Sequence, residues 1–175
     1  MRDEKDPAKR ILLHNLLRLL KGYGRTFHGY PRGYECALVI VCDLDDRDRT
    51  AFLAELQAVL DQCSPKPRTQ FCLAIEEGEA WLLGDLDAVR TAYPGARKAV
   101  LDDYVNDSIC GTWEVLADAV YPGGCTALIR KGWQAVGAEK HRWADRISPH
   151  MKVDKNASPS FCSFRDSVRI LRAKA

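Results

Sequence analysis

Two aspartates directly follow a short apolar run in the first half of the chain. The run 39–42 is too brief for a helix, and it ends at Asp43, with Asp45 two residues further on. If the run is a buried strand, Asp43 and Asp45 lie on one face, because strand side chains alternate at period two. Two carboxylates at the carboxyl end of a strand can hold a divalent cation, and oxygen ligands favour Mg²⁺ or Mn²⁺ over zinc. The alternative is that Asp46 or Asp48 caps the next helix and Asp43 is a turn residue.

A second acidic cluster follows the next apolar run, residues 71–75, and consists of Glu76, Glu77 and Glu79. If a helix starts near Glu76, then Glu76 and Glu79 share a face at the helix N-terminus, where negative charge is favoured. Because parallel strands end at one edge of a sheet, we expect both acidic clusters to converge there. Like charges held together cost energy unless a metal or a proton offsets them. The alternative is ordinary helix-capping chemistry.

A nucleic-acid substrate would also need cations, because an acidic site alone repels phosphate. The best candidates are Lys140, on a stripe at helical spacing, and Arg165 and Arg169 on the final helix, both expected to face solvent. The loop residues Arg25 and Arg32 come next. The alternatives are a snorkelling lysine and a solvated arginine face.

Composition narrows the class of protein. The 175 residues suffice for one domain, and 26 basic against 24 acidic residues give a net charge of +2, which neither demands nor excludes nucleic acid. Seven cysteines, an odd number at irregular spacing without a secretory leader, indicate a reduced cytoplasmic chain. No Cys-x-x-Cys pair is present, so we expect no zinc site. The apolar runs are too short to span a bilayer, so we expect no membrane partner.

Periodicity predicts an α/β fold with a small parallel sheet flanked by helices and a helical C-terminal part. The strand–helix–strand order makes a parallel pair the default. We expect one domain, with an α/β core over 35–95 and a mainly helical extension over 110–175. The predicted strands are 36–42 and 71–75, and the predicted helices are 7–21 (ended by Gly22), 52–62, 86–93, 113–120, a stripe from Trp133 to Ile147, and a last helix with Ser158 as N-cap and Pro159 at its first position.

Four segments together resemble a bacterial family known as domain of unknown function 4276, which is itself Toprim-like. They are Val39–Asp46, Ala74–Asp85, Trp143–Ile147 and Asn156–Phe161, and the acidic block before Trp81 is the most specific. The resemblance implies a Toprim-like α/β fold, in which catalytic members bind Mg²⁺ through a first-strand glutamate and an Asp-x-Asp pair.

Asp43 and Asp45 match that pair, but no residue matches the first-strand glutamate, and relatives usually carry a further N-terminal strand and helix. Either the polypeptide starts late, or the second acidic cluster supplies the missing carboxylate.

The leading hypothesis is a Mg²⁺- or Mn²⁺-dependent nuclease component, which the resemblance would associate with a separately encoded ATPase in bacterial defence against phage. Asp43, Asp45 and Glu77 are the expected metal ligands. Glu76 and Glu79 are the expected catalytic residues, one of them completing the shell or acting as general base. A second hypothesis is a non-catalytic protein-binding domain with a vestigial acidic site. A third is a nucleotide-processing enzyme, although no glycine-rich phosphate loop is present.

Overall fold

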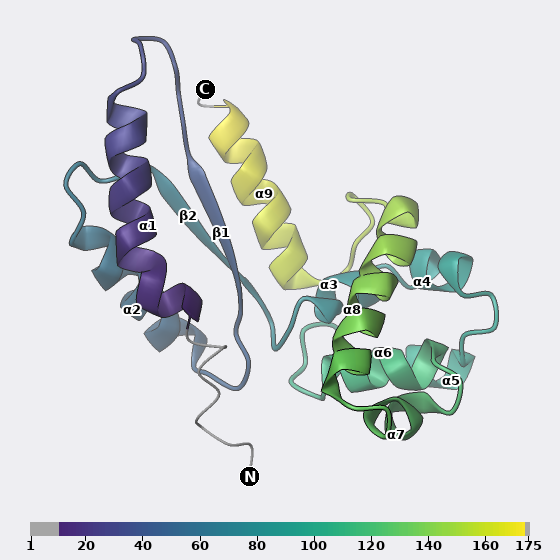
Figure 1. The fold of residues 1–175 in the computed structure, drawn as a ribbon. Coiled ribbons are helices and arrows are strands. Elements are labelled where there is room, and N and C mark those ends of the chain that lie inside the picture. The colour runs from purple at the N-terminus through teal and green to yellow at the C-terminus, as the bar shows by residue number, and fades with distance from the viewer. Residues whose placement is uncertain (1–10, 174–175) are drawn as a thin grey trace.

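The computed structural model describes residues 11–173 and confirms the α/β class. Strands β1 (Leu38–Asp43) and β2 (Thr69–Ala74) form a parallel pair, in register from Leu38 opposite Thr69 to Asp43 opposite Ala74. Helix α2 (Arg49–Asp61) connects the two strands. Helices α1 (Ile11–His28) and α2 lie on one side of the sheet, and α9 (Pro159–Ala173) lies on the other (Figure 1).

Local sequence accounts for the start of α2 and for the two sides of β1. Asp48 caps α2 by accepting a hydrogen bond from the Ala51 N–H at 2.8 Å, as one alternative reading of the acidic run predicted. Along β1, Leu38, Ile40 and Cys42 pack against the core formed with α1 and α2, whereas Val39 and Val41 are exposed. One face of the strand is therefore partly buried and the other is exposed.

Helix α1 differs from its predicted course. Its predicted start near Asp6 and Pro7 lies outside the described residues, and the helix does not stop at Gly22 but continues to His28. Gly24 is buried against the loop before β2, where an added Cβ would lie 2.2 Å from the Pro65 carbonyl oxygen. Close packing of the helix backbone on this loop outweighs the low helix propensity of glycine.

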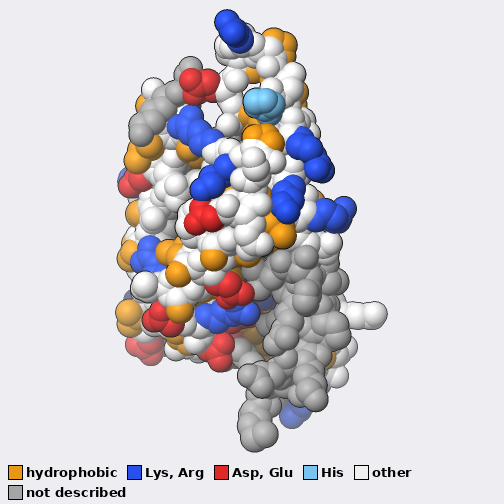
Figure 2. All heavy atoms as spheres, turned by 90° about the vertical axis from the view of Figure 1, so that its left-hand side faces the viewer, with side chains coloured by type: hydrophobic (Ala, Val, Ile, Leu, Met, Phe, Trp, Pro, Cys, Tyr) orange, Lys and Arg blue, Asp and Glu red, His pale blue; other side chains and the backbone are white. Residues whose placement is uncertain are grey.

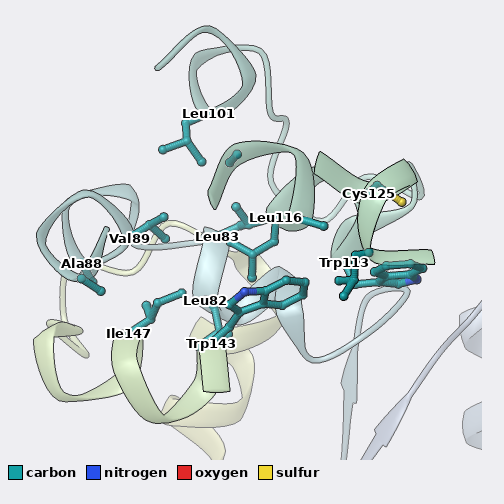
Figure 3. Packing of buried hydrophobic residues seen from close by; sticks show 14 of the residues in the cluster. Leu82, Leu83, Ala88, Val89, Leu101, Trp113, Leu116, Cys125, Trp143 and Ile147 are labelled. Carbon is teal, nitrogen blue, oxygen red and sulfur yellow. The ribbon is translucent and has the colours of Figure 1, made fainter. Parts of the chain in front are cut away.

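The remaining helices form a second hydrophobic core. These are α3 (Glu79–Leu83), α4 (Leu86–Ala92), α5 (Lys98–Asp102), α6 (Thr112–Val120), α7 (Gly124–Ile129) and α8 (Trp133–Ile147), followed by a 3-10 turn (Ser148–His150). Figure 3 shows Leu83, Leu116 and Trp143 pointing toward one another within this core. The buried stripe predicted for α8 holds for Val136, Trp143 and Ile147 but is wrong for Trp133, which is 73% exposed at the first turn of the helix.

Helix α9 begins as predicted and ties the two parts of the molecule together. Pro159 is its first residue, and the Ser158 hydroxyl accepts a hydrogen bond from the Phe161 N–H at 3.2 Å. The helix packs on β2, and its Phe164 stacks on Trp81 of α3 with ring centroids 4.9 Å apart. Within the described part of the chain, no helix has the length and apolarity needed to cross a bilayer.

Candidate functional site

The two acidic clusters lie side by side at the carboxyl end of the sheet. Beyond the last pair of β1 and β2, the Leu44 N–H donates to the Ala74 carbonyl at 2.9 Å, and the Asp45 N–H donates to the Glu76 carbonyl at 2.8 Å. These bonds hold the segment after β1 against the segment after β2. We call Asp43, Asp45, Glu77 and Glu79 the acidic cluster.

The backbone at this end departs from the predicted regular elements. Asp45 and Glu76 have φ of 53° and 59°, in the left-handed region that non-glycine residues rarely occupy. The strand alternation expected to align Asp43 with Asp45 therefore stops at Asp43. The predicted helix start at Glu76 is also wrong, because α3 begins at Glu79. The left-handed turn at Glu76 directs its side chain toward the loop before α6.

Glu76 is buried and bound to the loop before α6. Its carboxylate accepts the N–H of Gly111 at 3.0 Å and of Thr112 at 2.7 Å, a longer bond from Cys110, and the hydroxyl of Thr112. Burial by itself would raise the pKa of Glu76, but the hydrogen bonds from Thr112 and its neighbours outweigh it and lower that pKa. Glu76 thus serves as the cap of α6, whose own N-cap residue, Gly111, has no side chain to do so.

Lys140 reaches the acidic cluster from α8. Its ammonium lies 2.8 Å from Glu77 Oε2 and 3.2 Å from Glu79 Oε2, and all three side chains are largely covered. Burial by itself would lower the pKa of Lys140, but the charges of Glu79 and Glu77 raise it overall. Burial raises the pKa of Glu79, and the attraction of Lys140 offsets only part of that rise. Lys140 is therefore firmly cationic and acts as the counter-charge of two glutamates.

Asp43 stands at the solvent-facing side of the cluster. Part of it reaches water, yet surrounding protein atoms displace enough water to raise the pKa of its carboxyl group, and the charge of Glu77 raises that pKa further. Lys140 and a hydrogen bond from the Gly78 N–H oppose this rise, and Asp45 adds to it. The pKa of Asp43 is therefore raised by acids of both clusters, by Glu77 and by Asp45.

The donor chemistry suits a hard cation, since every candidate ligand is a carboxylate oxygen. Among the described residues, however, no three His, Cys, Asp or Glu side chains are arranged to share a metal ion. This agrees with the contacts above, because Lys140 holds Glu77 and Glu79 and the α6 loop holds Glu76. The arrangement fits a cation bound by one or two carboxylates and not a preformed three-carboxylate cage.

The two arginines of α9 that were predicted to contact nucleic acid are engaged in ion pairs. Arg169 lies 2.6 Å from Asp154, and Arg165 lies 2.8 Å from Asp166 and donates to the Val153 carbonyl. The expectation that both face solvent is wrong for Arg165, whose side chain is only 17% exposed because it folds back on the turn before α9. Of the predicted basic residues, Lys140 alone has a described contact with the acidic cluster.

A hydrogen-bond network that was not predicted from the sequence holds α9 in place. Asp107 accepts the Ser160 N–H at 2.6 Å and the Ser158 hydroxyl at 2.7 Å, and the Asn156 side chain donates to the Trp81 carbonyl at 2.8 Å. Trp81 in turn donates to the Ser160 hydroxyl at 2.9 Å. The Asn-x-Ser-Pro-Ser segment thus has a structural role here, which its helix-capping pattern only partly indicated.

No protein-family model matches this chain, and no curated protein or solved structure is significantly similar to it.

Proposed function

We propose that the chain is a metal-dependent, phosphodiester-cleaving component whose reaction centre is the acidic cluster. The observation that carries this proposal is that Asp43, Glu77 and Lys140 come from three different segments of the chain and meet beyond the carboxyl ends of parallel strands, where open α/β sheets bind ligands. A Toprim-like active site and a separately encoded ATPase partner in phage defence extend the proposal through the sequence resemblance alone.

Asp43 and Asp45 would hold Mg²⁺ or Mn²⁺, and Glu77, which Lys140 already binds, would lie beside them. Magnesium is commonly bound by one or two carboxylates together with substrate phosphates, so a three-carboxylate cage is not required. When bound, the ion would lower the pKa of a coordinated water and neutralise charge on the phosphate.

The other side chains would position and charge the site. Lys140 holds Glu77 and Glu79 in place through its two ion pairs and brings a positive charge toward a phosphate. Glu79 is the better general-base candidate, because the carboxylate of Glu76 is already committed to four donors of the α6 loop. Glu76 would instead fix that loop beside the site.

The ion pairs of Lys140 favour a second function. Because Lys140 already neutralises part of the acidic cluster, the cluster needs no metal to be stable. On this alternative, the chain is a non-catalytic domain that binds another protein.

Metal binding distinguishes the two functions. We expect millimolar Mn²⁺ to raise the melting temperature of the wild-type chain by ligand linkage, and we expect Asp43→Asn and Asp45→Asn to abolish that rise. Asp103→Asn, which removes an exposed acid at the end of α5, is the matched control and should respond as wild type does.

In EDTA, Asp43→Asn should melt no lower than wild type, because the raised pKa means that the fold disfavours the charged form of Asp43. Its loss of response then cannot be attributed to unfolding. A wild-type chain that shows neither a Mn²⁺ shift nor Mn²⁺-dependent cleavage of DNA or RNA would favour the protein-binding function.

A further inference from the structure

Four aromatic side chains form a column at the C-terminal end of α1. They are Tyr23, Phe27, Tyr30 and Tyr34, at spacings of four, three and four residues. Consecutive ring centroids lie 5.7, 6.1 and 6.1 Å apart, and the Phe27 and Tyr30 rings are stacked. Tyr23, Tyr30 and Tyr34 are nevertheless exposed, Tyr34 to 72%. We call these four residues the aromatic column.

The hydrophobic cores do not account for this column. The face of α1 that packs on the sheet is supplied by Leu16 and Leu20, which are almost completely buried. Contiguous exposed apolar side chains on a folded chain mark interaction sites, whereas scattered single ones need no explanation. The column is therefore available to a partner.

The charge around the column is positive. Residues 15–36 contain one acid, Glu35, and four basic residues, Arg18, Lys21, Arg25 and Arg32. Glu35 is already paired with Arg68 at 3.2 Å, and no carboxylate in the described part of the chain pairs with Lys21, Arg25 or Arg32. Figure 2 shows Lys and Arg side chains gathered around hydrophobic ones in the upper part of this face.

A hollow of about 340 Å³ lies beside the column. Phe27, His28 and Tyr34 line one side of it, and Lys66 and Arg68, which are paired with Asp61 and Glu35, lie in the loop on the other. Small-molecule sites begin at about 300 Å³, so the hollow has room for a single flat ring beside the column.

We propose that the aromatic column and its flanking cations bind single-stranded nucleic acid. Proteins that hold single strands combine aromatic side chains, on which successive bases stack, with basic residues along the phosphates. A membrane surface fits less well, because an interfacial helix needs a wide apolar face and that of α1 is used by the core. The inference deepens the proposed function and rests on it for the identity of the substrate, which becomes a single strand.

Binding is best measured without metal, by fluorescence anisotropy of a labelled oligothymidylate in EDTA at low salt. We expect the wild type to bind, and Tyr30→Ala/Tyr34→Ala to lose affinity by roughly tenfold or more as two stacking rings are removed. Tyr30→Phe/Tyr34→Phe keeps both rings and should retain the affinity. Trp133→Ala removes an exposed aromatic from the far helical part and should bind as wild type does.

The salt dependence tests the cations separately. Arg25→Ala/Arg32→Ala should reduce the slope of log affinity against log salt by about 1.4, or about 0.7 for each phosphate that is no longer neutralised. Arg130→Ala/Lys131→Ala, on the helical part, should leave the slope unchanged.

Metal-free binding also separates this inference from the proposed function. If the wild type binds the oligonucleotide but shows no Mn²⁺-dependent cleavage, the aromatic column is supported and the nuclease proposal is contradicted. If the wild type cleaves and Tyr30→Ala/Tyr34→Ala loses no affinity, the nuclease proposal is supported and the role of the column is contradicted. The inference is overturned if the wild type does not bind the oligonucleotide or binds phosphatidylserine vesicles instead. It is also overturned if sedimentation shows that the only effect of Tyr30→Ala/Tyr34→Ala is to dissociate a dimer.

Discussion

Glu76 and Glu79 lie three residues apart in the sequence and have opposite electrostatic environments. Hydrogen bonds from the α6 loop lower the pKa of Glu76 despite its burial, whereas burial raises the pKa of Glu79 despite Lys140. The difference arises from the left-handed turn at Glu76, which directs one carboxylate to backbone donors and leaves the other facing an ammonium group. Sequence spacing alone cannot distinguish two such glutamates.

Replacing Glu76 with Ala should therefore destabilise the fold. The N–H groups of Gly111 and Thr112 and the Thr112 hydroxyl would lose their acceptor, which we expect to cost about 2–4 kcal/mol. Urea denaturation measures this cost. Glu55→Ala, at an exposed position of α2, is the control and should change the free energy of unfolding by no more than about 0.5 kcal/mol. Equal losses in the two variants would contradict the capping role of Glu76.

Among the elements, α1 offers a matched pair of glycines. Among the described residues, nothing lies within 4 Å of a Cβ added at Gly22, so Gly22→Ala should stabilise the helix by up to about 1 kcal/mol. At Gly24 the same gain in helix propensity is opposed by a clash with the Pro65 backbone, and Gly24→Ala should destabilise the protein by about 1–3 kcal/mol. Thermal melting of both variants tests this, and a stabilised Gly24→Ala would show that α1 does not pack closely on this loop.

Elements with strong local signals were predictable from sequence. The strand pair, the Asp48 and Ser158 caps and the helix 133–147 were all indicated by apolar periodicity or by capping residues. The course of α1 beyond Gly22 and the start of α3 at Glu79 were not, because a tertiary contact at Gly24 and a bridge between Asp45 and Glu76 decide them. Likewise, adjacent strand ends indicated where the acids would gather, but nothing local indicated that Glu76 would bind a loop 35 residues away.

At the scale of the whole molecule, two hydrophobic cores are joined by polar contacts and by α9. One core lies between the sheet and helices α1 and α2, and the other lies among helices α3 to α8. The Lys140 ion pairs, the Glu76 hydrogen bonds and the stacking of Phe164 on Trp81 connect them. We therefore expect the two parts to unfold together.

Tryptophan fluorescence can test this cooperativity, because all four tryptophans lie between residues 81 and 143, outside the sheet core. Leu56→Ala empties a fully buried position of α2 and should cost about 2–5 kcal/mol. If the parts are coupled, the urea midpoint seen by tryptophan fluorescence should fall together with the midpoint seen by circular dichroism. Separate midpoints in this variant would mean that the two cores unfold independently.

The left-handed backbone of Asp45 has an evolutionary consequence. An aspartate in this conformation carries a strain that glycine would not, while its carboxylate is one of the proposed metal ligands. Mutation to glycine would thus relax the backbone and delete a ligand in one step. Among relatives of this fold that lack the proposed metal chemistry, we therefore expect glycine at position 45 more often than a replacement of Glu76, because Glu76 caps α6.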